Sequence, residues 1–171
     1  MNLDGLIIRN ATKNDIEQLA RIKIEGWENA YNDIVDNSYL DNMSINEQIE
    51  KYSNRYSLKD VFVTEIESEI IAFCRVYDYD KLEFDDKEID CEIREIYVRP
   101  DLKRMGIGSK LFDYVLTYFK GKNKKKLYLG VFEENYKSRK FYEKMGGILW
   151  KKGCLIIDQV EYPIVSYLYK L

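Results

Sequence analysis

The sequence has 171 residues, of which 46% are hydrophobic and 33% charged, which is typical of one soluble globular domain spanning residues 1–171. Its net charge of −3 argues against a general affinity for nucleic acid, because such binding depends on neutralising phosphate groups. The chain has no histidine, which excludes a histidine base, a Ser-His or Cys-His nucleophile and a histidine-ligated zinc site. Its three cysteines are widely spaced and form no metal-binding pattern, so we expect no bound metal.

The N-terminal part of the chain is predicted to contain one strand and two helices. Its first residues lack the basic start and apolar core of a signal peptide, and no apolar run is long enough to span a membrane, so we expect a cytoplasmic protein. A short strand is expected over Leu6–Arg9. Apolar residues at helical spacing from Ile16 to Trp27 predict a helix that begins near Thr12. The capping box Ser44-Ile45-Asn46-Glu47 predicts a second helix start.

The middle of the chain is predicted to be rich in strands. Residues Val61–Ile66 and Ile70–Tyr77 predict a hairpin around Glu67-Ser68-Glu69. The acidic stretch Asp78–Asp90 is predicted to be an exposed loop or a frayed strand extension, and a further hypothesis is that it attracts a polycation. A strand is then expected over Cys91–Val98, ending before Pro100.

The C-terminal half alternates between helices and strands before it ends in strands alone. We expect a helix over Ile107–Lys120, a strand over Leu127–Phe132 and a helix over Tyr136–Met145, which Gly146 would end with a left-handed cap. Residues Ile148–Leu171 predict two or three strands. This order predicts one mixed sheet with helices on both faces.

The most informative segment is the turn that joins the strand Cys91–Val98 to the following helix. Gly106 and Gly108 lie where this turn enters the helix. The first N–H groups of a helix lack internal partners and favour an anion, and glycine lets a ligand approach the backbone closely. Lys103 and Arg104 would add positive charge. The pattern fits neither the dinucleotide fingerprint nor the Walker motif, so these residues predict a phosphate-binding turn or a purely structural one.

A family resemblance distinguishes between these two possibilities. The segment Lys103-Arg-Met-Gly106-Ile-Gly108 resembles the Gln/Arg-x-x-Gly-x-Gly/Ala turn of the GCN5-related N-acetyltransferase (GNAT) superfamily, with lysine in the first position. Residues Asn135 to Gly146 resemble the next motif of that family, and the opening strand and helix with Trp27-Glu-Asn-Ala-Tyr31 are similar to many members. The resemblance covers nearly the whole chain.

The resemblance implies a fold and an acyl donor. The fold would be α/β (α+β), with a mixed, mostly antiparallel central sheet, helices on both faces, and a splay between two central parallel strands, here Cys91–Val98 and Leu127–Phe132. Acetyl-CoA would lie in that splay, with the amide near Val98 polarising its carbonyl group. Asn135 would contact the pantetheine or fix the cleft. The donor-binding residues that the resemblance implies are Ile96, Tyr97, Val98, Lys103, Arg104, Met105, Gly106, Ile107, Gly108, Ser109, Asn135, Ser138 and Tyr142.

The resemblance also implies catalytic residues. Tyr142 matches a tyrosine that family members place beside the CoA sulfur, where a phenol with a pKa of about 10 can protonate a departing thiolate. The alternative is an aromatic residue packed in the core. Glu92 matches the glutamate base of some members, and its alternative is a surface carboxylate paired with Arg94 or a lysine. Glu92 and Glu95 would point to opposite faces of a regular strand, unless a bulge shifts their parity.

The implied activity is direct transfer of an acetyl group to the primary amine of a small molecule, such as a polyamine, an amino acid or an amino sugar. Trp27, Tyr31 and Glu95 are the implied acceptor-binding residues, and a pocket closed by the Trp27–Ser44 region would favour a small acceptor over a peptide. A covalent intermediate on Cys91 is not expected. The alternatives are a peptide or protein acetyltransferase, a non-enzymatic CoA-binding domain, and a phosphate binder unrelated to CoA. A homodimer is possible, and no membrane partner is expected.

Overall fold

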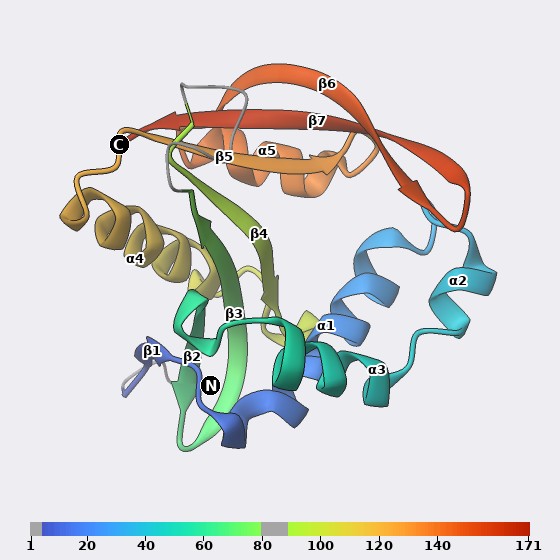
Figure 1. Ribbon diagram of the computed structural model, residues 1–171, viewed down its shortest axis with the longest axis horizontal. Coiled ribbons are helices and arrows are strands. Elements are labelled where there is room, and N and C mark those ends of the chain that lie inside the picture. The colour runs from blue at the N-terminus through green and yellow to red at the C-terminus, as the bar shows by residue number, and fades with distance from the viewer. Residues whose placement is uncertain (1–4, 80–88) are drawn as a thin grey trace.

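The computed structural model describes residues 5–79 and 89–171, and these residues form one sheet of seven strands (Figure 1). The strands follow the order β1-β2-β3-β4-β5-β7-β6 across the sheet. Only β4 and β5 pair in parallel, while every other neighbouring pair is antiparallel. The strands are β1 (Ile7–Asn10), β2 (Val61–Ile66), β3 (Glu69–Asp78), β4 (Cys91–Val98), β5 (Lys126–Phe132), β6 (Ile148–Ile157) and β7 (Val160–Lys170).

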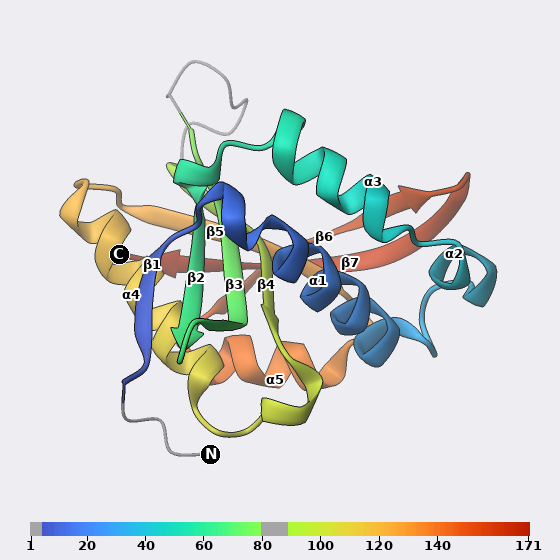
Figure 2. The same cartoon turned by 90° about the horizontal axis from the view of Figure 1, so that it is seen from below.

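Helices cover both faces of the sheet, as the sequence predicts. Figure 2 shows α1 and α3 on one side of the central strands and α4 and α5 on the other. The helices are α1 (Ile16–Tyr31), α2 (Asn37–Asp41), α3 (Ile45–Glu50), α4 (Ile107–Gly121) and α5 (Tyr136–Lys144). The predicted mixed, mostly antiparallel sheet is thus confirmed, and the C-terminal segment forms two strands.

Each face of the sheet has its own hydrophobic core. On the α4 face, Leu111, Phe112 and Val115 are fully buried against inward-facing residues of β3, β4 and β5. On the α1 face, Leu19 and Tyr52 pack on strands β2 and β3. Burial of apolar area of this kind, at about 25 cal/mol per Å², holds the helices to the sheet. The sheet is therefore fixed from both sides along its centre, where β4 and β5 lie.

The helix starts follow the predicted capping residues. The Ser44 Oγ accepts a hydrogen bond from the N–H of Glu47 at 3.4 Å, and α3 begins at the next residue after Ser44. The Asp15 carboxylate accepts from the Thr12 N–H at 2.6 Å, and a single 3₁₀ turn precedes α1. The short helix α2 was not predicted, because its five residues are too few to show helical periodicity.

The acidic stretch Asp78–Asp90 falls partly outside the described residues, which omit 80–88. At its two described ends the stretch is not an exposed loop, whereas the alternative of a strand extension holds at one end, because β3 runs to Asp78. Tyr79 and Ile89 are buried, and the Asp90 carboxylate accepts hydrogen bonds from the N–H groups of Lys125 and Lys126. These contacts attach both ends of the stretch to the sheet. No helix within the described residues is long and apolar enough to cross a membrane.

Candidate functional site

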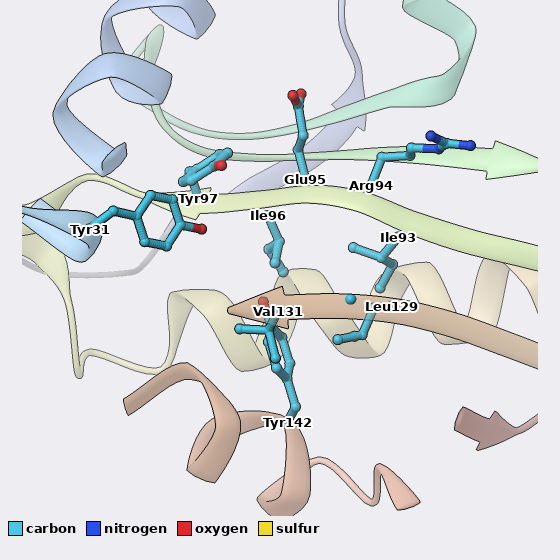
Figure 3. Close-up of a pocket in the computed structure, with 10 residues that line it drawn as sticks. Tyr31, Ile93, Arg94, Glu95, Ile96, Tyr97, Leu129, Val131 and Tyr142 are labelled. Atoms are coloured by element: carbon cyan, nitrogen blue, oxygen red, sulfur yellow. The ribbon is translucent and has the colours of Figure 1, made fainter. Parts of the chain in front are cut away.

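A cleft opens where the two parallel strands separate. Strand β4 pairs with β5 at only three positions, the last joining Ile93 to Leu129. Beyond that point β5 continues beside β7, and no strand in the described part of the chain pairs with the β5 side of Arg94–Val98. Figure 3 shows the residues of both strands that line this opening, with Tyr31 at one end. The predicted splay between the parallel strands is therefore present.

The unpaired edge of β4 carries backbone groups that can bind a ligand. Arg99 donates its N–H to the carbonyl oxygen of Ile71 in β3, at 2.9 Å. Successive residues of an extended strand direct their N–H groups to opposite edges. The Val98 and Ile96 N–H groups therefore face the cleft, where an extended amide-containing chain can pair with them.

A β-bulge in β4 determines which side chains face which side of the sheet. Arg75 of β3 pairs with Glu95, but the next residue, Val76, pairs with Ile93, so Arg94 is an extra residue in β4. The bulge places Ile93 and Ile96 on the same face, toward α4, although they are three residues apart. Glu92 and Glu95 accordingly share the opposite face.

The turn before α4 has the geometry of an anion-binding site. Gly106 is the N-cap residue of α4 and has a φ of 83°, a left-handed value that glycine adopts without strain. The first helix-type hydrogen bond joins the Lys110 N–H to the Gly106 carbonyl oxygen at 3.0 Å. The amides of Ile107, Gly108 and Ser109 therefore lie in the first turn, where helix N–H groups have no intrahelical acceptor.

Positive charge lies beside this turn. Lys103 donates a hydrogen bond to the Asn29 side chain in α1. Burial, and then the nearby ammonium group of Lys137 on α5, lower the pKa of Lys103. Two ammonium groups that destabilise one another in this way would both be stabilised by a bound phosphate. The turn and its two lysines therefore fit the pyrophosphate that the sequence predicts, and sequence analysis missed Lys137.

Tyr142 reaches the cleft from α5. Figure 3 shows its ring pointing toward the opening between β4 and β5, where it lines the cavity together with Val131. Burial raises the pKa of Tyr142, so the phenol stays protonated at neutral pH. Its hydroxyl makes no hydrogen bond within residues 5–79 and 89–171. The ring packs near Phe112 and Phe141, so both the catalytic and the packing interpretation describe part of its surroundings.

Glu95 lies in a buried cluster of charges. Its carboxylate accepts hydrogen bonds from Lys23 at 2.5 Å, Tyr52 at 2.8 Å and Arg75 at 3.0 Å. Burial alone would raise the pKa of Glu95, but the cations of Lys23 and Arg75 lower this pKa to about 2. Glu95 therefore stays ionised, and its oxygens are already occupied by protein donors.

Glu92 has different surroundings. It lies next to the first cleft-lining residue, Ile93, and burial raises its pKa despite a hydrogen bond from Tyr79. The Arg94 side chain forms an ion pair with Glu92 at 2.9 Å, as one of the two interpretations expected, but the Glu92 side chain is only 11% exposed and is not a surface carboxylate. A carboxylate with a raised pKa is a better proton acceptor than Glu95.

Trp27 and Tyr31 belong to an aromatic cluster at the end of α1. Tyr31 packs edge-on against Phe132 of β5, with ring centroids 4.8 Å apart. Trp27 packs against Tyr31 at 5.0 Å. Tyr31 lines the cleft, whereas Trp27 supports it from behind. Both residues therefore lie on the α1 side of the cleft, where Asn29 of the same helix accepts a hydrogen bond from Lys103.

Two further predicted residues, and the cysteine for which no catalytic role is expected, have structural explanations. The Asn135 side chain caps α5 by accepting a hydrogen bond from the Ser138 N–H at 3.1 Å. Gly108 lies close to Val98, because a Cβ atom there would be 3.4 Å from the Val98 side chain. Cys91 is buried and its pKa is raised, which makes it a poor nucleophile. No group of three or more potential metal ligands occurs within the described residues.

Comparison with known proteins identifies a single family. A family model described as "Acetyltransferase (GNAT) family" matches residues 19–147. An uncharacterized N-acetyltransferase from Archaeoglobus fulgidus is 30% identical over 135 residues, which cover 79% of this chain and 88% of that protein.

Two solved structures share the fold over almost the whole chain. PaiA N-acetyltransferase from Thermoplasma acidophilum, solved in complex with coenzyme A, has a TM-score of 0.66 and 20% identity, covering 96% of this chain and 99% of that chain. The structure of yncA from Salmonella typhimurium with its cofactor acetyl-CoA has a TM-score of 0.67 and 16% identity, covering 97% and 94%. The expected fold is thereby confirmed.

Proposed function

Because this chain belongs to the acetyltransferase (GNAT) family, and is thus an acyltransferase, we propose that it transfers an acetyl group from acetyl-CoA to the primary amine of a small molecule. Residues 1–171 act as one cytoplasmic domain in this proposal. The observation that carries it is the unpaired edge of β4 from Arg94 to Val98, which ends beside the Gly106 turn. An extended pantetheine arm and a pyrophosphate require these two features in this order.

The donor is held largely by backbone groups. The amides of Ile96 and Val98 pair with the pantetheine arm, and the Val98 amide is the donor nearest to the α4 turn. The first-turn amides of α4, with Lys103 and Lys137, hold the pyrophosphate. The bound thioester supplies the acetyl group, and its carbonyl oxygen gains negative charge that a cleft-facing amide stabilises.

Two side chains move the protons. Glu92, acting through a water molecule, takes a proton from the acceptor ammonium, which frees the nitrogen lone pair. The nitrogen bonds to the acetyl carbon as the carbon–sulfur bond breaks, and Tyr142 gives its proton to the departing sulfur. The new amide nitrogen then releases its extra proton, which restores the Tyr142 phenol. Placing the two reactants together is worth about 7–11 kcal/mol, whereas one acid or base contributes roughly 10²–10⁴-fold. The scaffold therefore contributes more than either side chain.

A small acceptor is favoured by the closure of the cleft at its α1 end. Trp27, Tyr31 and Val35 pack with Phe132 and Tyr162 in one cluster that joins α1 and the following loop to β5 and β7. The Asp36 N–H also donates to the Tyr162 hydroxyl at 3.2 Å. This cluster covers the side by which a peptide chain would pass through, so a peptide acceptor is less favoured. The unpartnered Tyr142 hydroxyl argues against a purely regulatory domain.

Calorimetric titration with acetyl-CoA, with free CoA and ADP as controls, tests the donor site. We expect binding of acetyl-CoA and CoA to the wild type. Gly106→Trp should abolish it, because the backbone there is left-handed and faces the pyrophosphate. Gly121→Trp is the matched control, because that glycine lies at the other end of α4 with open space around it. Retained CoA affinity in a folded Gly106→Trp variant would refute the assignment. An acetyl-transfer screen over amines and peptides then tests the acceptor.

A further inference from the structure

The Glu92 carboxylate is held by only one of its two oxygens. The Tyr79 hydroxyl donates a hydrogen bond to Glu92 Oε2, and the Arg94 Nε lies 2.9 Å from the same oxygen. The other oxygen, Oε1, has no hydrogen-bond partner within residues 5–79 and 89–171, and it is not completely buried. Water can therefore reach Oε1, although the Glu92 side chain is only 11% exposed.

A further hydrogen bond joins the two groups that hold Oε2. The Arg94 Nη2 donates to the Tyr79 hydroxyl at 3.0 Å, so Tyr79 accepts from Arg94 while it donates to Glu92. Burial, followed by the hydrogen bond to Glu92, raises the pKa of Tyr79, so the proton stays on the phenol. A hydroxyl that accepts from a cation is a stronger donor, because linked hydrogen bonds polarise one another. Tyr79 and Arg94 therefore act on Glu92 as one unit.

The position of Tyr79 is fixed by its backbone and its ring. The Tyr79 N–H donates to the Asp90 carbonyl oxygen at 3.0 Å, which continues the pairing of β3 with β4 by one residue. Its own carbonyl oxygen accepts a hydrogen bond from Lys124 at 3.2 Å. The residue is buried, and its ring centroid lies 4.8 Å from that of Tyr77. Tyr79 is thus held firmly enough to keep a second side chain in one orientation.

Glu92 lies where the cleft begins. It pairs with Tyr128 of β5, one position before the last β4–β5 pair, and the next two residues, Ile93 and Arg94, line the cleft (Figure 3). Arg94 therefore contacts both the cleft and the Oε2 atom of Glu92. A carboxylate at this place, with one oxygen fixed and the other accessible to water, can accept a proton through that water without turning away.

We infer that Tyr79 and Arg94 are positioning residues, which together hold Glu92 by Oε2 and leave Oε1 to the water molecule that receives the proton of the acceptor amine. The inference rests on the proposed function, which makes Glu92 the base. The acceptor ammonium gives a proton to the water as the water gives one of its own protons to Oε1. The water is thereby regenerated, and Glu92 releases its proton to solvent before the next turnover. Tyr79 and Arg94 keep their protons throughout.

The surroundings of Glu92 determine how its titration should respond. Burial raises the pKa of Glu92, and the hydrogen bond from Tyr79, followed by the charges of Arg94 and Arg75, acts against this increase. The other titratable groups on the elements beside Glu92 are Tyr77 of β3, Glu95 of β4, Tyr128 of β5 and Tyr56, which stacks on Arg75. Of these, only Glu95 can take up a proton in acid, and its pKa of about 2 keeps it ionised. A fall in activity above pH 4.5 that Glu92→Gln removes therefore reports Glu92.

Tyr79→Phe keeps the ring and removes the hydrogen bond. Because that bond stabilises the carboxylate, the acidic fall of kcat/KM should move upward by about one pH unit, in line with the strength of hydrogen bonds to charged groups. Tyr77→Phe is the matched control, because Tyr77 lies opposite Glu92 on β3 but its hydroxyl makes no hydrogen bond within the described residues. Its pH profile should equal that of the wild type. A Tyr79→Phe profile that coincides with the wild type would overturn the inference.

Arg94→Gln tests whether the two positioning residues act together. This variant should also move the acidic fall upward, because it removes a cation beside the carboxylate. In the Arg94→Gln background, Tyr79→Phe should shift the fall less than in the wild type, because the hydroxyl has already lost its own donor. Equal shifts in both backgrounds would overturn the claim that Tyr79 and Arg94 act as a unit. Urea denaturation checks that each variant is folded.

NMR titration separates this inference from the proposed function. The carboxyl signal of Glu92, identified by its absence in Glu92→Gln, is followed with pH in the wild type, Tyr79→Phe and Tyr77→Phe. A midpoint raised in Tyr79→Phe alone supports the hold of Tyr79 on Glu92 even if no amine is acetylated, a result that would refute the proposed function alone. Acetyl transfer whose acidic fall depends on Glu92, with the same Glu92 midpoint in all three proteins, would refute the inference alone.

Discussion

The buried carboxylate of Glu95 provides the sharpest test of the structure, through the Glu95→Gln variant. The two cations beside it lower the pKa of Glu95 to about 2, from an ordinary value of 4.5. At 1.36 kcal/mol per pH unit, this difference corresponds to about 3 kcal/mol of stability. Because the folded-state pKa is the lower one, this stability is fully present above about pH 4.5 and is lost as the pH falls toward 2.

Replacing the carboxylate by an amide removes that contribution and leaves Lys23 and Arg75 as buried cations without their counter-charge. Breaking a buried ion pair in this way costs about 3–5 kcal/mol, a large share of the 5–15 kcal/mol typical of a whole domain. We therefore expect urea denaturation at pH 7 to show a loss of about 3 kcal/mol for Glu95→Gln. Between pH 4.5 and 2 the stability of the variant should fall less steeply than that of the wild type.

Glu17→Gln is the matched control, because Glu17 also forms an ion pair, at 2.7 Å with Arg21, but its side chain is 63% exposed. Its effect should stay within about 0.5 kcal/mol. A Glu95→Gln variant within 1 kcal/mol of the wild type, with an unchanged dependence on pH, would show that the cluster contributes no net stability and that this reasoning is wrong.

Three further predictions concern the cleft. Tyr142→Phe should lower kcat by roughly 10²-fold while calorimetry shows unchanged CoA affinity, and equal rates under chemistry-limited conditions would remove Tyr142 from the mechanism. Glu92→Gln should lower kcat/KM only partly, by about tenfold. In the wild type kcat/KM should fall at acidic pH as Glu92 is protonated, at a pH above the ordinary glutamate pKa because burial raises the pKa of Glu92. The variant should not show this fall, and an identical fall in the variant would exclude Glu92 as the base. Gly26→Ala would place a Cβ atom 2.6 Å from the Tyr97 ring and should lower the free energy of unfolding in urea by about 1–3 kcal/mol. Gly121→Ala is the control, because there is open space around Gly121. Equal stability of the two variants would contradict the packing of Gly26 against Tyr97.

Periodicity and glycine positions were sufficient to predict much of the fold. The apolar spacing of α1 and α4 and the run Cys91–Val98 each predicted an element that the structure contains within a few residues. The Gly106 turn was recognisable because two local rules, helix N-terminal chemistry and glycine conformation, apply to adjacent residues. Both signals are local, so they survive in the sequence without knowledge of tertiary contacts.

Features that depend on distant contacts were not predictable in this way. Lys23 and Glu95 are 72 residues apart in the sequence, so no local pattern joins them. Tyr79 and Glu92 are 13 residues apart, so their hydrogen bond follows only from the way in which β3 pairs with β4. Gly26 looks like an ordinary helix residue until the Tyr97 ring is placed against it. In each case the informative quantity is a tertiary distance, which composition and spacing do not contain.

The bulge at Arg94 shows how one such contact changes the interpretation of the site. With a regular strand, Glu92 and Glu95 would face opposite sides, and only one of them could share a face with Tyr31. The extra residue places both carboxylates on the α1 side, while Ile93 and Ile96 keep an apolar surface toward α4. Glu95 is neutralised by its buried cations, whereas Glu92 is close to the cleft and has a raised pKa. The same bulge therefore separates a carboxylate that stabilises the protein from one that is suited to accept a proton.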